Sequence, residues 1–167
     1  MANHAVRAGL GAGRYPAVST EVEVLARHRL ERAREALGEG DALHGAGAFR
    51  GAVSRFYYAA LHAARALLAV RGVDSARHSG VIHLFQTHFV KTQIIPADIA
   101  RGFPRAFEKR LDTDYADFSE VTAEDALRIR SDISAFVDAC TRALDGLLQE
   151  SDASRHGPSK PETADPA

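Results

Sequence analysis

The chain of 167 residues has one cysteine, no tryptophan and almost no net charge. A lone Cys140 cannot form an internal disulfide, and the lack of a cysteine cluster argues against a structural zinc site. The formal net charge is −1 at pH 7, so no strongly basic surface indicates a tight, sequence-specific reader of nucleic acid. This charge balance still allows an enzyme that meets RNA briefly in a local cleft.

Long apolar runs are also missing. Residues 1–18 contain no apolar segment of the kind that a secretory signal requires. The most apolar run, 59–70, is interrupted by His62 and Arg65 and is too short to span a bilayer. We therefore expect no membrane association and a cytoplasmic location.

The composition favours one globular domain with a tail at each end. With 46% hydrophobic and 26% charged residues, the chain falls in the ordinary soluble class. Residues 1–18 are rich in glycine and alanine without periodicity and are predicted to form a flexible leader. Residues 151–167 carry three prolines and are predicted to form a disordered tail. The domain is then expected over 19–150.

Apolar residues recur at helical spacing throughout that domain, and strand patterns are nearly absent. Ser19 or Thr20 can cap a first helix that continues to about His44. The second helix, about 49–71, is apolar around most of its circumference, which is typical of a central helix. Its many alanines would let neighbouring helices approach closely.

The second half of the chain predicts a short helix and two longer ones. Ser79 is expected to cap the short helix, and Pro96 suits the first turn of the next one. Gly102 and Pro104 should break or kink that helix. Thr122 opens the last helix, with Asp125 completing a capping box. The prediction is an all-α, antiparallel up-and-down bundle of four main helices plus a short helix.

The candidate site residues lie mainly between positions 105 and 115. Arg110 and Asp114 are four apart, so they share a helical face and can pair. Arg105 and Lys109 lie on neighbouring turns and would form a phosphate-attracting patch with Arg110. Tyr115 continues the apolar stripe of this helix, which would place its hydroxyl near the patch. The alternative is an exposed salt bridge of little energetic value.

Three residues upstream are further candidates. His78 precedes a predicted helix start, where the positive end of the helix would favour a neutral imidazole that can act as a base. A simple capping or loop histidine is the alternative. Residue chemistry alone favours Tyr57 and Tyr58 as core aromatics with their hydroxyls bonded at the rim.

His83 and His88 are five apart without a nearby carboxylate, so no metal site and no cofactor are predicted. Cys140, within the apolar stripe of the last helix, is expected to be a core residue.

Several segments together resemble the HEPN superfamily, and in particular its UPF0332 branch. These segments are 52–68 (AVSRFYYAALHAARALL), 77–81 (RHSGV), 89–91 (FVK), 110–115 (RLDTDY) and 122–126 (TAEDA). Each motif is weak alone, but their order and spacing make the combination specific. The resemblance covers about 29–148.

The resemblance implies a helical bundle that usually dimerises, so that two copies of one helix line a shared cleft. Many HEPN domains are metal-independent ribonucleases that act as toxins, often encoded beside a small nucleotidyltransferase-like antitoxin. Their signature is an arginine followed, after four to six residues, by a histidine. In some, a tyrosine just after that histidine is modified with AMP by the partner. In a metal-free ribonuclease a base accepts the 2′-hydroxyl proton and a cation stabilises the phosphorane.

This chain departs from the signature at one position. Arg110 matches the arginine, but Tyr115 stands where the histidine is expected. A tyrosine with an ordinary pKa near 10 is a poor base at neutral pH. Catalysis would then need His78 to reach the cleft, or Tyr115 to donate a proton beside Arg110.

These patterns support three hypotheses. The first is a toxin–antitoxin component, homodimeric through the Arg110 helix, that cleaves RNA with Arg110, Tyr115 and His78 as catalytic residues. Its substrate- or partner-binding residues would be Asp114, Arg105, Lys109 and Tyr58. The second is a non-catalytic module that binds a nucleotide or a nucleotidyltransferase-like partner. In the third, the Arg110–Asp114 pair merely stabilises its helix.

Overall fold

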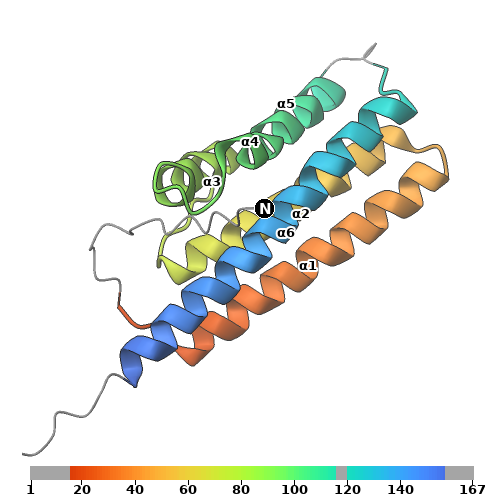
Figure 1. Cartoon of the computed structure of the whole chain (residues 1–167). Coiled ribbons are helices and arrows are strands. Elements are labelled where there is room, and N and C mark those ends of the chain that lie inside the picture. The colour runs from red at the N-terminus through yellow and green to blue at the C-terminus, as the bar shows by residue number, and fades with distance from the viewer. Residues whose placement is uncertain (1–15, 116–119, 157–167) are drawn as a thin grey trace, which may run out of the picture.

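A computed structural model describes residues 16–115 and 120–156, and every regular element in these ranges is helical. The elements are α1 (Thr20–Gly45), α2 (Phe49–Val70), α3 (His78–Phe85), the π-helical turn η1 (Gln86–Val90), α4 (Ala97–Ala100), α5 (Gly102–Tyr115) and α6 (Ala123–Arg155). If α4 and α5 are counted together, the described residues form four long helical stretches and the short helix α3. This arrangement confirms the predicted all-α bundle (Figure 1).

Helix α2 lies at the centre of the bundle, as its apolar circumference predicts. It packs against α1, α6, α5 and α3, while α3, α4 and α5 follow one another along one side (Figure 1). Six of its alanines are fully buried: Ala52, Ala59, Ala60, Ala63, Ala64 and Ala66. Small side chains let the neighbouring helices approach α2 from several directions, so its remaining polar side chains lie close to those neighbours.

Two of the three predicted N-caps are present, at Ser19 and Thr122. The Ser19 hydroxyl accepts a hydrogen bond from the amide of Val22 at 3.3 Å. Thr122 and Asp125 form the reciprocal capping box of α6, with bonds of 3.1 and 3.3 Å. These short-range signals need no tertiary partner, which is why the sequence alone locates them.

The predicted boundary at residue 150 is wrong, because α6 continues to Arg155. The prolines that stop a helix begin only at Pro158. The extra turn is also held in place, since the amide of Val18 donates to Ser151 Oγ at 2.8 Å. The predicted flexible leader therefore ends in an ordered contact at Val18, while its residues 1–15 and the tail 157–167 lie outside the described residues.

The short helix begins earlier than predicted. His78 is its first residue and Arg77 its N-cap, so Ser79 lies inside the helix and does not cap it. The predicted break near Gly102 is confirmed, since Arg101 separates α4 from α5. Pro104 falls in the first turn of α5, where the missing amide hydrogen costs no helical hydrogen bond.

The core holds the lone cysteine and a close contact between two helices. Cys140 is completely buried, as predicted, and burial raises the pKa of its thiol. Helix α1 passes close to α2 at Gly40, which faces the Phe56 ring. Among the residues that the structure describes, no helix is both long and apolar enough to cross a membrane.

Candidate functional site

Arg110 of α5 lies over two tyrosine rings of α2. Its guanidinium carbon is 5.1 Å from the ring centroid of Tyr57 and 5.0 Å from that of Tyr58. Both distances are within the range of a cation–π interaction. The predicted Arg110–Asp114 pair is also present, with Nε 3.4 Å from Oδ2. The Arg110 side chain is only 20% exposed, so the cation is held in a largely dry environment.

His78 reaches the same tyrosines from a third helix, α3. Its ring centroid is 5.6 Å from that of Tyr57 and 6.2 Å from that of Tyr58. We call the four residues Tyr57, Tyr58, His78 and Arg110 the tyrosine cluster. The cluster brings together His78 and Arg110, on which the ribonuclease hypothesis depends, although they are 32 positions apart in the chain.

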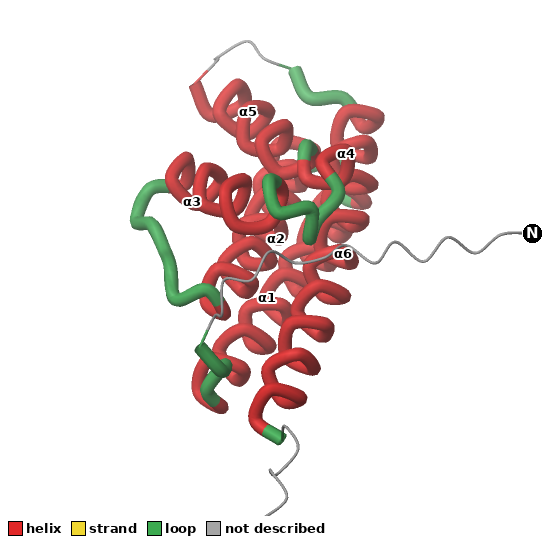
Figure 2. Tube along the Cα trace, turned by 60° about the vertical axis from the view of Figure 1, so that its left-hand side comes forward, coloured by secondary structure: helices red, strands yellow, loops and turns green. Residues whose placement is uncertain are grey.

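The loop before His78 is anchored to α2 by Arg65. Its Nη2 donates to the carbonyl oxygen of Ser75 at 3.0 Å, and its Nε lies 3.4 Å from Asp74 Oδ1. Arg29 of α1 adds a weaker ion pair to Asp74 at 3.8 Å. Figure 2 shows this loop, in green, running along the side of the bundle to α3. These contacts hold the start of α3, and with it the imidazole, beside the tyrosines.

The His78 imidazole favours its neutral form. Burial lowers its pKa from the ordinary value of 6.5, and the positive charges of Arg110 and Arg65 lower it further. The sequence predicted a neutral imidazole at this position from the helix terminus alone. The structure adds two further causes of the lowered pKa, because desolvation and nearby cations both oppose the imidazolium form. His78 is therefore able to accept a proton at neutral pH.

Tyr57 is completely buried, as the core interpretation predicts, between His78 and the rings of Phe103 and Phe107. The expectation that its hydroxyl is bonded at the rim is wrong, because no hydrogen bond of standard geometry reaches it, although the adjacent Arg110 lowers the pKa of the phenol against the effect of burial. Burial raises the pKa of Tyr57 to about 12, so the group keeps its proton and remains a donor. Tyr58 is only partly buried and forms the more accessible edge of the cluster.

The predicted phosphate patch is wrong in part, because its cations face different helices. Arg105 lies 3.9 Å from Asp132 and Lys109 lies 3.5 Å from Asp125, both carboxylates belonging to α6. Arg105 and Lys109 are four residues apart and share one face of α5, whereas Arg110 is rotated by about 100° toward α2. The structure therefore separates Arg110 from the other two.

Tyr115 is not part of the cluster. It ends α5 and is 83% exposed, so its predicted place in the apolar stripe of the bundle is wrong. Five helical residues turn the chain by about 500°, which leaves Tyr115 about 140° away from the direction of Arg110.

Arg55 is a member of the site that the sequence interpretation missed. Its guanidinium carbon lies 5.3 Å from the Tyr58 ring centroid, and its Nε lies 2.9 Å from Glu39 Oε2 of α1. The signal was its position one turn before Tyr58 on α2. That spacing is informative only when a second cation is known to approach the same ring.

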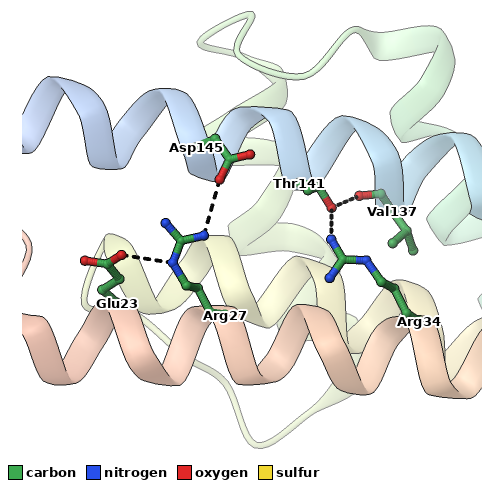
Figure 3. A network of polar contacts seen from close by, with 6 residues as sticks. All are labelled: Glu23, Arg27, Arg34, Val137, Thr141 and Asp145. Atoms are coloured by element: carbon green, nitrogen blue, oxygen red, sulfur yellow. Dashed lines mark hydrogen bonds and ion pairs between the residues drawn. The ribbon is translucent and has the colours of Figure 1, made fainter.

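A second set of polar contacts lies between α1 and α6 (Figure 3). Arg27 contacts Glu23 at 2.9 Å and Asp145 at 3.4 Å. Arg34 donates to the Thr141 hydroxyl at 3.4 Å, and that hydroxyl donates to the Val137 carbonyl oxygen at 2.9 Å. Each named cation has a partner here, and both arginines line the hollow between the two helices. The arrangement fits a polar seam between two helices.

The comparison with known proteins agrees with this architecture. A family model described as the HEPN domain matches residues 26–144. The chain belongs to the HEPN family. A UPF0332 protein of Thermotoga maritima is 31% identical over 127 residues, which cover 76% of this chain and 96% of that protein. The resemblance to the UPF0332 branch is thereby confirmed.

Two relatives of this HEPN chain carry a functional name. The Methanocaldococcus jannaschii protein named "Putative toxin MJ0605" is 33% identical over 119 residues, covering 71% of this chain and 88% of the relative. A second one, "Putative toxin MJ0142", is 29% identical over 97 residues, covering 58% and 66%. The chain is thus similar to two proteins that carry the name "Putative toxin".

Proposed function

We propose that this HEPN chain is the toxin-type member of a toxin–antitoxin pair and cleaves RNA at the tyrosine cluster without a metal ion. One observation carries the proposal: Arg110 of α5 and His78 of α3 meet on the same two tyrosine rings of α2. A fixed cation beside a neutral imidazole is the minimum that metal-free phosphodiester cleavage requires.

The chemistry follows from the two groups. Neutral His78 accepts the proton of a ribose 2′-hydroxyl, and the 2′-oxygen attacks the adjacent phosphorus. A bond forms between phosphorus and the 2′-oxygen while the bond to the 5′-oxygen breaks. The leaving 5′-oxygen then takes a proton from the imidazolium. Arg110 binds the phosphate oxygens and offsets the charge of the phosphorane. The products are a 2′,3′-cyclic phosphate and a 5′-hydroxyl.

The proposal includes a homodimer formed through α5. Two features of that helix support it: Tyr115 is a large side chain with 83% exposure, and Asp114 beside the cluster is 47% exposed. In a dimer that pairs the two copies of α5, Tyr115 would lie near the partner's cluster. Light scattering on the purified protein should give twice the mass of the chain.

The test uses purified protein and mixed RNA in EDTA. Arg110→Ala removes the cation of the cluster. Arg105→Ala is the control, because it removes a cation of the same helix that faces α6 and is 58% exposed. The wild type and Arg105→Ala should cleave, and Arg110→Ala should lose at least 100-fold in rate. Cleavage that is absent, or equal in the two variants, would overturn the proposal.

A second candidate function is a non-catalytic module that binds a nucleotide or a nucleotidyltransferase-like antitoxin through Arg110 and Asp114. It is favoured by Tyr115, which replaces the expected histidine and lies outside the cluster. In that case the wild type would leave RNA intact in EDTA but bind AMP or the partner in calorimetry, and Arg110→Ala would abolish that binding. Loss of thermal stability alone in Arg110→Ala would indicate a structural pair.

A further inference from the structure

Two guanidinium groups approach the single ring of Tyr58. Arg55 lies 5.3 Å and Arg110 5.0 Å from its centroid, so the two cations are at most about 10 Å apart. Like charges this close, and largely shielded from water, repel each other. An anion bound between or beside them would relieve that repulsion.

Each of the two arginines also has a buried donor that makes no hydrogen bond. Arg55 Nε lies 2.9 Å from Glu39 and Arg110 Nε lies 3.4 Å from Asp114, yet neither contact has hydrogen-bond geometry. Buried donors without a well-aligned hydrogen bond are rare in folded proteins. The two carboxylates are about half exposed, so a phosphate can replace them without unfolding the helices.

Positive charge continues along α2 beyond Arg55. Burial lowers the pKa of His62, and four arginines around it lower the pKa further: Arg32, Arg55, Arg65 and Arg29. The carboxylates on this face are Glu35, Glu39 and Asp74, which pair with these same arginines. The carboxylates of these pairs are about half exposed, so water screens each pair and phosphate can compete for the arginines.

We propose that Arg55 is a second phosphate-binding residue of the site and that the ligand is single-stranded RNA with at least two consecutive phosphates. This inference rests on the proposed function: Arg110 holds the phosphate that is cleaved, and Arg55 holds the neighbouring phosphate along α2. The partly exposed Tyr58 ring is in contact with both guanidinium groups.

The test is fluorescence anisotropy with a labelled single-stranded RNA oligonucleotide, in a His78→Gln background that does not cleave. Arg55→Ala should weaken binding at least threefold and lower the slope of log K against log salt by about 0.7. Arg128→Ala on α6 removes an arginine that is 73% exposed and also paired at 3.6 Å, with Glu124, and should change nothing. A change below threefold for Arg55→Ala would overturn the inference.

Glu39→Gln separates binding from folding. It breaks the same α1–α2 ion pair as Arg55→Ala but leaves the cation in place. If Arg55 binds phosphate, Glu39→Gln binds RNA as well as or better than its parent. If Arg55 only links the helices, both variants lose binding and melting temperature together, and the inference fails. Cleavage by the wild type with unchanged binding in Arg55→Ala would sink this inference alone. Arg55-dependent binding without any cleavage would sink the ribonuclease proposal instead.

Discussion

Arg110 holds its guanidinium carbon 5.1 Å from the ring centre of Tyr57, across the contact between α5 and α2. This contact places a permanent cation above an aromatic ring that is completely buried. At such a site the interaction contributes about 0.5–2 kcal/mol, and Arg110 is the first of the charges that hold the pKa of His78 down. Arg110 therefore contributes both to the stability of the fold and to the lowered pKa of His78.

The Tyr57 hydroxyl should be dispensable for stability. It is buried without a hydrogen bond, and leaving such a group unsatisfied costs about 1–3 kcal/mol. Tyr57→Phe removes the orphaned donor and keeps the ring, so the free energy of unfolding in urea should stay constant or rise by about 1 kcal/mol. Tyr57→Ala is the matched control and should lose about 3–5 kcal/mol. Destabilisation of more than about 1 kcal/mol by Tyr57→Phe would mean that the hydroxyl has a partner.

The His78 pKa should lie below 6.5 and depend on Arg110. A cation beside the ring disfavours the imidazolium, so Arg110→Ala should move the pKa of His78 upward, toward 6.5. The cleavage rate should increase as His78 loses its proton and become constant at neutral pH. NMR titration of the imidazole protons measures the pKa directly, with the exposed His83 of the same helix as an internal reference. An unchanged His78 pKa in Arg110→Ala would contradict the proposed geometry.

The lowered pKa values also predict a pH dependence of stability. His78 and His62 both have folded-state pKa values below 6.5. Between the folded and unfolded values, the unfolded chain binds more protons, so the free energy of unfolding falls as the pH decreases through this window. Urea unfolding at pH 7.5 and pH 5.5 should show the loss, and it should be smaller in His62→Gln. Equal stability at both pH values would be inconsistent with the lowered pKa values of these two partly buried imidazoles.

Two glycines of α1 should respond to alanine in opposite directions. A Cβ at Gly40 would overlap the buried Phe56 ring, whereas one at Gly38 meets nothing within 4 Å. Gly40→Ala should therefore destabilise the fold by about 1–3 kcal/mol through overpacking, and Gly38→Ala should stabilise it by about 0.5–1 kcal/mol. Thermal melts of both variants test the packing of α1 on α2. The same sign for both changes would show that the helices do not meet at Gly40.

Local patterns were sufficient to predict much of the fold. The caps at Ser19 and Thr122 depend on neighbours within three residues, and the central position of α2 follows from its apolar circumference. The Arg110–Asp114 pair likewise follows from helical spacing. Each of these features is fixed by one segment of chain.

The site was harder to predict because its members come from different helices. The sequence shows that Arg105 and Arg110 are near each other, but not that α6 faces one and α2 the other. His78 contacts Tyr57 because Arg65 anchors the loop between them. Such contacts depend on which helices are neighbours in the bundle, and helical periodicity does not determine that.

The most direct test of the proposed ribonuclease site is the rate of RNA cleavage in EDTA by His78→Gln, compared with His83→Gln on the same short helix. Each variant removes one imidazole from α3. His78 lies against the tyrosine pair, whereas His83 is exposed. We predict a loss of at least 100-fold for His78→Gln, with the rate of His83→Gln equal to that of the wild type. Equal rates in the two variants would contradict a catalytic role for the tyrosine cluster.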